Sequence, residues 1–175
     1  MAQEDGHEKS VLLIEASSYY ARLLGSWASE QGYTNVRLAA DTQRAWSMLL
    51  VERFDLIVCD RNVGPDDGLE LTRQLRLARD NPNRYSPLVL MASASTQRLV
   101  ETARDCGINE FLAKPISKKA FVERLQAIAV KPRNFIKAGV FFGPDRRRRP
   151  ADYQGEDRRK RAAEKVSKDD DIVLI

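Results

Sequence analysis

Residues Asp55–Asp60 read DLIVCD, a short apolar run between two aspartates. A run of this length is typical of a strand that is buried on both faces of a parallel sheet. Four further apolar runs alternate along the chain with stretches in which apolar residues recur every three or four positions. These runs occupy residues 11–14, 35–39, 88–93 and 110–113. Five strand–helix pairs in strict alternation predict an α/β fold, in which helices cover both faces of a five-stranded parallel sheet.

The helical stretches between these runs have recognisable ends. They are expected at residues 18–32, 42–54, 69–80, 96–107 and 117–130. Asp41 and Ser117 are predicted N-caps, because their side-chain oxygens can accept hydrogen bonds from free backbone amides of the first turn. Gly32 is a predicted C-cap, because glycine readily adopts the left-handed conformation.

Four polar residues follow strands of the predicted sheet: Glu15, Asp60, Ser93 and Lys114. The carboxyl ends of parallel strands lie at one edge of a sheet, where α/β proteins place their functional sites. We therefore expect these four side chains to converge.

The motifs DLIVCD, ASA (92–94) and FLAKP (111–115) resemble the receiver domain of two-component response regulators. The resemblance covers about residues 10–130 and implies a flavodoxin-like, CheY-like fold. It implies that Asp60 is the phosphoryl acceptor and that Ser93, Phe111 and Lys114 are the switch residues.

The resemblance also exposes a departure at the expected metal site. Where the family has two acidic residues after the first strand, this chain has Glu15-Ala16, so Glu15 and Asp60 are the remaining candidate ligands for Mg²⁺. Loss of one carboxylate removes an oxygen ligand and a negative charge. We expect Mg²⁺ binding and phosphorylation at Asp60 to be weak or absent. In the alternative interpretation, Lys114 simply neutralises Glu15 and Asp60 in a degenerate site.

Composition and charge indicate what kind of protein this is and what kind of partner it binds. The chain has 175 residues, enough for one domain and an appendage, and its polar N-terminus and lack of a long apolar run predict a cytoplasmic protein without membrane insertion. Residues 1–130 carry 16 basic and 17 acidic residues, whereas residues 131–165 carry 12 basic and 5 acidic residues. The second segment is expected to bind an anionic partner.

Helical periodicity stops near residue 130, which divides the chain into four predicted parts. They are a flexible N-terminus (1–9), the receiver domain (10–130), an arginine-rich extension (131–165) and an acidic, apolar C-terminal tip (166–175). Because prolines and glycines interrupt the extension, we expect a basic C-terminal tail that is disordered when free.

The extension contains the pattern G-x-D-R-R twice, beginning at Gly143 and at Gly155. An aspartate can accept hydrogen bonds from N1–H and N2–H₂ of guanine, and an arginine can donate two to O6 and N7 or pair with phosphate. An aromatic ring can stack on the base. The candidate residues for a ligand with two guanines and two phosphates, such as cyclic di-GMP, are Asp145, Arg146, Arg147, Arg148, Arg149, Tyr153, Asp157, Arg158 and Arg159.

The stretch FFGPDRRRRPADYQGEDRRKR (141–161), together with the receiver, resembles the Cle group of CheY-like proteins. The resemblance implies that the extension binds cyclic di-GMP, with an intercalated nucleotide dimer as the expected form. It implies recruitment to the flagellar base at the cell pole and contact with the flagellar motor switch protein. The expected outcome is reduced motility and increased surface attachment.

Two other functions remain open from the sequence. One is a phosphorylation-dependent single-domain response regulator, and the other is a nucleic-acid-binding regulator that uses the basic tail. The aspartates before each arginine pair disfavour DNA, because a carboxylate does not strengthen binding to a polyanion. We expect no enzyme, since the sequence contains no nucleophile–base pair, P-loop or metal cluster.

Overall fold

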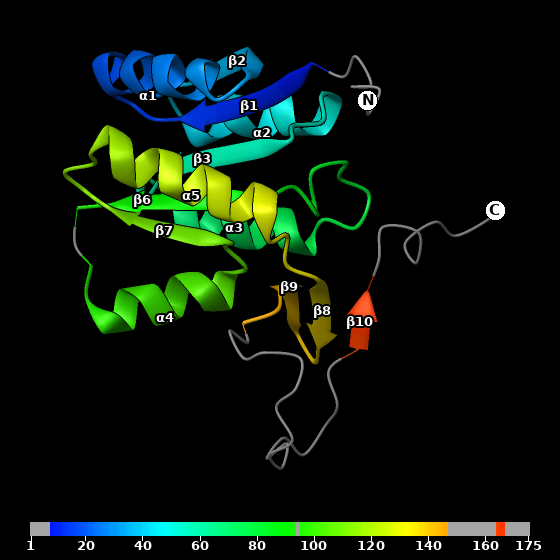
Figure 1. The fold of residues 1–175 in the computed structure, drawn as a ribbon. Helices are drawn as coiled ribbons and strands as arrows, with labels where there is room; N and C mark the ends of the chain where they lie inside the picture. Colours follow the sequence, from blue (N-terminus) through cyan, green and yellow to red (C-terminus); the bar gives the residue numbers. More distant parts are fainter. Residues whose placement is uncertain (1–7, 94, 147–163, 167–175) are drawn as a thin grey trace, which may run out of the picture.

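A computed structural model of the chain describes residues 8–93, 95–146 and 164–166. Its centre is a parallel sheet of five strands: β1 (Lys9–Ile14), β2 (Tyr33–Ala39), β3 (Leu56–Asp60), β6 (Leu88–Ala92) and β7 (Glu110–Ala113). They lie in the order β2-β1-β3-β6-β7, so the run DLIVCD is the central strand, and Figure 1 shows the sheet between its helices. The predicted parallel α/β fold is confirmed.

Five helices connect these strands, as expected. They are α1 (Ser18–Glu30), α2 (Thr42–Val51), α3 (Gly68–Leu77), α4 (Gln97–Cys106) and α5 (Lys118–Val130). The predicted N-caps are confirmed: Asp41 accepts from the amide of Arg44 at 2.6 Å, and Ser117 accepts from that of Ala120 at 3.2 Å. The C-cap of α1 is Gln31, and Gly32 follows it with a left-handed φ of 88°.

Two apolar clusters hold the helices on the sheet. Buried residues of α1 and α5, such as Leu24 and Phe121, pack on one face against Leu13 and Val89. On the other face, α2, α3 and α4 pack against the strands through a cluster that includes Leu49. Side chains alternate between the two faces along each strand, so the central strands β3 and β6 are buried along their whole length.

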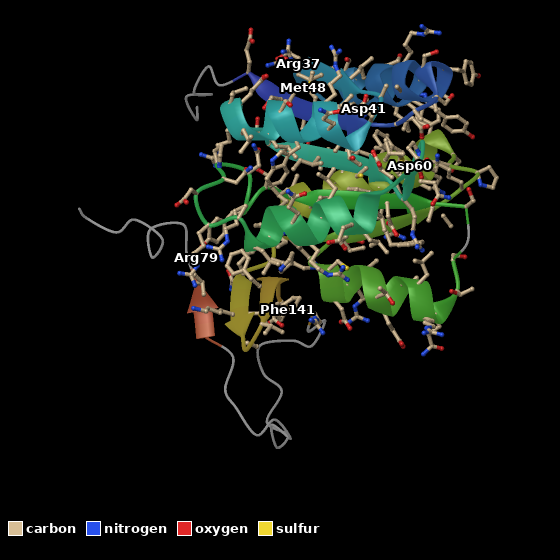
Figure 2. All side chains as sticks on the ribbon, turned by 180° about the vertical axis from the view of Figure 1, so that it is seen from behind. Arg37, Asp41, Met48, Asp60, Arg79 and Phe141 are labelled. Atoms are coloured by element: carbon tan, nitrogen blue, oxygen red, sulfur yellow. The ribbon has the colours of Figure 1, made fainter. Side chains whose placement is uncertain are left out.

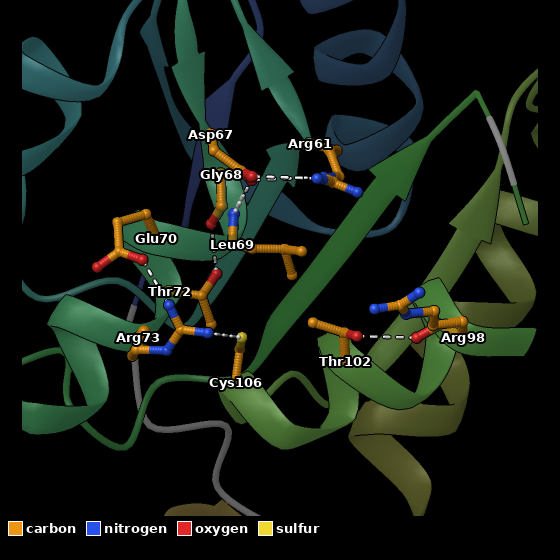
Figure 3. Close-up of polar contacts among 10 residues, drawn as sticks. All are labelled: Arg61, Asp67, Gly68, Leu69, Glu70, Thr72, Arg73, Arg98, Thr102 and Cys106. Carbon is orange, nitrogen blue, oxygen red and sulfur yellow. Dashed lines mark hydrogen bonds and ion pairs between the residues drawn. The ribbon is translucent and has the colours of Figure 1, made fainter. Parts of the chain in front are cut away.

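The loop between β3 and α3 contains a short hairpin that the sequence did not predict, β4 (Asn62–Val63) and β5 (Asp66–Asp67). Asp67 caps α3 by accepting from the amide of Leu69 at 2.8 Å, and it pairs with Arg61 at 3.1 Å (Figure 3). Gly68 lies so close to β3 that a Cβ there would be 2.1 Å from the carbonyl oxygen of Asp60. Glycine at this position lets α3 begin directly against the central strand.

The chain after residue 130 differs from the expected disordered tail over the part that the structure describes. β8 (Phe135–Ala138) and β9 (Phe141–Pro144) form an antiparallel hairpin, and β10 (Glu164–Val166) pairs antiparallel with the other edge of β8. Gly139 in the turn has a left-handed φ of 61°. The predicted disorder is therefore wrong for this hairpin, whereas residues 147–163 and 167–175 lie outside the described residues.

An aromatic cluster attaches the hairpin to the α/β fold. Phe135 and Phe142 pack on each other and on Tyr85, with ring centroids 5.1 to 5.5 Å apart. The guanidinium of Arg84 lies 3.7 Å from the centroid of the Phe142 ring, and that of Arg76 lies 5.1 Å from Phe135. Periodicity did not reveal this hairpin, because it is short and its apolar residues need partners that lie about fifty residues earlier in the chain.

None of the described helices combines the length and the apolar character that a membrane-spanning segment needs.

Candidate functional site

The structure brings Glu15, Asp60 and Lys114 together at the carboxyl edge of the sheet. The ammonium of Lys114 lies 2.8 Å from a Glu15 oxygen and 2.6 Å from an Asp60 oxygen. The side chains of the two acids are only 4% and 9% exposed, and that of the lysine is 16% exposed. One cation thus pairs with two nearly buried carboxylates.

Backbone contacts fix these three residues. Glu15 directly follows β1, its amide donates to the carbonyl of Ala39, and one of its carboxylate oxygens accepts from the amide of Ser17 at 2.9 Å. Lys114 directly follows β7, and its amide donates to the carbonyl of Ala92. Because all the parallel strands end at one edge of the sheet, the long side chain of Lys114 reaches Glu15, 99 positions earlier in the sequence.

The electrostatics of Lys114 favour its charged form. Partial burial lowers the pKa of the ammonium, but hydrogen bonds and charge attraction from Asp60 and Glu15 raise it by more. The net result is a pKa above the ordinary value for lysine. Lys114 is therefore protonated at neutral pH and forms a persistent ion pair with both acids.

The other two expected switch residues do not join this ion-paired group. Ser93 lies just beyond β6 and is exposed. Phe111 in β7 is partly buried and packs against the apolar cluster under α2, α3 and α4. Their functional roles remain predictions.

The residues present fit a magnesium ion poorly. Two carboxylates face the site, and both are already bound to Lys114. Ala16, where a third carboxylate was expected from the resemblance, is exposed and offers no side-chain oxygen. Within the described residues, no group of three or more acidic, histidine or cysteine side chains could hold a metal ion.

Two of the residues predicted to bind a guanine ligand are described, Asp145 and Arg146. Asp145 follows β9 directly, and its amide donates to the carbonyl of Asn134 at 2.8 Å. Arg146 forms an ion pair with Asp105 of α4 at 2.6 Å, and its guanidinium lies 3.8 Å from the centroid of the Phe141 ring. The other predicted residues lie outside the described part of the chain, namely Arg147, Arg148, Arg149, Tyr153, Asp157, Arg158 and Arg159.

The end of α4 and β9 approach each other closely. The guanidinium of Arg104 donates to the carbonyl of Arg146 at 3.2 Å. A Cβ on Gly143 would be 2.9 Å from the Cα of Gly107, which caps α4 with a left-handed φ of 95°. The first G-x-D-R-R copy thus begins in direct contact with the receiver.

The two candidate sites lie at opposite edges of the sheet. Tyr85 and Gly107, which contact the hairpin, precede the first residues of β6 and β7, whereas Asp60 is the last residue of β3. Figure 2 shows Asp60 at the end of the central strand and Phe141 in the hairpin, far from it in the molecule. Of the described residues, Asp145 and Arg146 therefore lie away from Asp60.

Sequence reasoning missed the residues of the receiver that contact Arg146. Arg104 and Asp105 end an exposed helix, and nothing in their local pattern distinguishes them from solvated surface charges. Arg76 is a further surprise: its fully buried guanidinium donates to three carbonyls, those of Gly107, Arg84 and Ser86. Burial lowers the pKa of Arg76 first, and the charge of Arg84 lowers it further, to about 9. Arginine nevertheless remains protonated in proteins, and the three carbonyls stabilise the charged form.

The five parallel strands lie in the order expected of a receiver domain. At their carboxyl ends Lys114 is ion-paired with Glu15 and Asp60, as a receiver site requires. Residues 11–126 match the response regulator receiver domain family, and the chain belongs to this family, which consists of signalling rather than catalytic proteins. The family typically binds Mg²⁺ at its phosphorylation site.

Relatives of this chain include regulators of several kinds. It is 27% identical to the chemotaxis protein CheY of Pseudomonas aeruginosa, over 67% of this chain and 94% of CheY. It is 28% identical to the regulatory protein VirG of Agrobacterium fabrum, over 71% of this chain and 47% of VirG. The chain thus spans almost all of one relative and about half of the other.

Solved structures agree with this assignment. The receiver domain of a sensor histidine kinase from Pseudomonas aeruginosa, with a magnesium ion in its active-site cleft, has a TM-score of 0.62 and 26% identity. The match covers 71% of this chain and all of that one. CheY4 of Vibrio cholerae has a TM-score of 0.64 over 70% of this chain, and at 21% identity this likeness concerns the fold alone.

Proposed function

We propose that the chain is a receiver-domain adaptor whose arginine-rich segment binds cyclic di-GMP. The observation that carries the proposal is the duplicated G-x-D-R-R pattern, with copies beginning at Gly143 and Gly155. Each copy supplies an acceptor for the Watson–Crick edge of guanine next to donors for its Hoogsteen edge or for phosphate. Two copies match a ligand with two guanines and two phosphates, or an intercalated dimer of it.

The position of the first copy supports this proposal. Asp145 and Arg146 follow β9 without a break, so the hairpin holds the start of the segment on the receiver. Arg104 of α4 brings another guanidinium next to the backbone of Arg146. Clustered arginines repel one another, and an anionic ligand relieves that repulsion.

The resemblance to the Cle group extends the proposal to an output. The liganded protein would contact the flagellar motor switch protein at the flagellar base, lower motility and promote surface attachment. The similarity to chemotaxis proteins supports a signalling output of this kind. Tracking of swimming cells that carry the wild-type chain or the Asp145→Asn/Asp157→Asn variant tests this output.

A second candidate function is phosphorylation at Asp60, which the contact of Lys114 with Asp60 favours. The poor fit of Mg²⁺ acts against it, because the ion neutralises charge on the incoming phosphoryl group. We propose that phosphorylation is slow and that the nucleotide is the main input. Stoichiometric labelling of Asp60 within minutes by acetyl phosphate and Mg²⁺ would reverse that order.

Calorimetric titration of the full chain with cyclic di-GMP tests the main proposal. The wild-type chain should bind in the micromolar range or tighter, and Asp145→Asn/Asp157→Asn should bind at least about ten-fold more weakly, since each guanine edge contact contributes about 1–3 kcal/mol. Asp80→Asn/Glu101→Gln is the matched control, because both residues are exposed and it changes the net charge equally.

Titration with duplex DNA distinguishes guanine recognition from general attraction to anions. The Asp145→Asn/Asp157→Asn variant should bind DNA as well as the wild type does, because the loss of negative charge does not weaken contacts with phosphate. Absence of heat with cyclic di-GMP, or tight binding of DNA regardless of guanine content, would refute the proposal.

A further inference from the structure

We propose that Asp105 of α4 competes with the ligand for Arg146, so that the receiver restrains its own nucleotide site and senses when that site is occupied. This inference rests on the proposed function, since it concerns one arginine of the same site. It adds a role for receiver residues that the repeat pattern did not indicate. The described contacts of Arg146 carry the argument.

Arg146 is held on the receiver by three different contacts. Its Nη1 lies 2.6 Å from Oδ1 of Asp105, and its Cζ lies 3.8 Å from the centroid of the Phe141 ring. Its carbonyl accepts from Nη2 of Arg104 at 3.2 Å. A ligand that uses this guanidinium must therefore take it from a carboxylate.

The receiver satisfies the hydrogen-bonding groups of Arg146 only in part, so a better ligand can displace its contacts. Asp105 is paired with one terminal nitrogen, and among the described residues the buried Nε of Arg146 has no acceptor. A guanidinium is best satisfied by two acceptors in a fork, such as a phosphate or the O6 and N7 atoms of guanine. The Asp105 carboxylate is also 61% exposed, so solvent weakens the ion pair. A bidentate ligand can displace it.

Release of Arg146 has a consequence for α4. This helix buries only Ala103 and Cys106, whereas α3 buries six residues, so α4 depends more on contacts at its end. That end is held by Arg104, Asp105 and the close approach of Gly107 to Gly143. Removal of Arg146 from Asp105 takes away one of these restraints, while the bonds of Arg76 to Gly107 and of Arg73 to Cys106 remain. Occupancy of the arginine-rich segment is thereby linked to the position of α4.

The test compares Asp105→Asn with Glu101→Gln in the full chain, by calorimetric titration with cyclic di-GMP. Glu101 lies one turn earlier on α4 and is exposed, and its carboxylate is paired with Gln97 rather than with Arg146. Both substitutions remove one negative charge and keep the shape. Asp105→Asn should tighten binding about two- to five-fold, the range of a partly exposed ion pair, and Glu101→Gln should leave it within about 1.5-fold of wild type.

A second arm tests whether the effect passes through Arg146. In an Arg146→Gln background, Asp105→Asn should no longer change the affinity, because the guanidinium for which Asp105 and the ligand compete is absent. In the wild type, the amide resonances of Asp105 and Gly107 should shift on addition of the nucleotide.

The outcomes separate this inference from the proposed function. A wild-type chain that releases no heat refutes the proposed function, and the inference with it. Suppose that the wild-type chain binds the nucleotide, but Asp105→Asn and Glu101→Gln change the affinity equally, or Asp105→Asn weakens it. Either result refutes the competition by Asp105 and leaves the proposed function standing. Persistence of the Asp105 effect without Arg146 also refutes the competition.

Discussion

At the scale of single residues, Lys114 supplies the positive charge at the carboxyl ends of the strands, where Glu15 and Asp60 meet. It is the cation that contacts both Glu15 and Asp60, and all three side chains are largely buried. Lys114 therefore supplies positive charge to two neighbouring, nearly buried carboxylates.

Replacement of Lys114 by Met should destabilise the fold by about 3 kcal/mol at neutral pH, because it leaves two buried carboxylates without a counter-charge. Chemical denaturation with urea measures this loss. Addition of Glu15→Gln and Asp60→Asn to Lys114→Met should restore most of the stability. An equal loss in the triple variant would show that the unpaired carboxylate charges are not its cause.

The pH dependence of this contribution follows from the raised pKa of Lys114. The ion pair stabilises the folded state fully below the unfolded pKa of about 10.4, and the stabilisation is lost as the pH rises through the higher folded value. Urea midpoints measured between pH 8 and pH 12 should fall more steeply for the wild type than for Glu15→Gln/Asp60→Asn. Parallel curves would contradict the role of the ion pair.

Ala16 accounts for the poor fit of Mg²⁺. Ala16→Asp should strengthen Mg²⁺ binding about ten-fold or more, because it adds an oxygen ligand and a charge beside Glu15 and Asp60. Titration of amide resonances with MgCl₂ measures this affinity. Ser18→Asp is the control, since it adds the same charge two residues further on, at an exposed position. Equal effects of the two variants would indicate general attraction of the cation.

At the scale of elements, the β8–β9 hairpin is part of the folded domain. Phe142 is 6% exposed and contacts Tyr85, Phe135 and Arg84, whereas Val140 in the same hairpin is 97% exposed. The two residues therefore provide a matched pair for a test of the docking.

Phe142→Ala should lower stability by about 3 kcal/mol, because it removes a buried aromatic side chain and leaves a cavity beside Tyr85. Val140→Ala should stay within about 0.5 kcal/mol of the wild type, because the side chain is in solvent. Urea denaturation of both variants decides the matter. Indistinguishable midpoints would mean that the hairpin does not dock in solution.

At the scale of the whole molecule, the folded unit extends beyond the receiver boundary expected near residue 130. The hairpin buries Phe135, Ile136 and Phe142 at the edge of the sheet opposite Asp60. Asp60 and the described start of the arginine-rich segment, Asp145 and Arg146, thus lie at opposite ends of the strands.

Two truncations locate the end of this unit. A chain that ends at Arg146 keeps the hairpin and should melt within a few degrees of the wild type. A chain that ends at Asn134 loses three buried side chains and should melt roughly 10 °C lower. Differential scanning calorimetry measures both. Equal melting temperatures would place the boundary near residue 130, as the sequence pattern suggested.

The sequence by itself determined the parallel α/β fold, the N-caps Asp41 and Ser117, and the polar residues that follow several strands. These features depend on local periodicity and on the common edge at which parallel strands end. The sequence also identified Ala16 as a departure in the expected metal site. Five buried apolar runs such as DLIVCD allow few other arrangements.

The tertiary structure decided what depends on contacts between distant parts of the chain. It docked Phe142 on Tyr85 and placed Arg146 against Asp105. Such contacts leave no periodic signal, because each partner alone is an ordinary charged or aromatic residue. Their energy comes from burial of aromatic surface and from charge pairing, which arise only when the fold has brought the two side chains together.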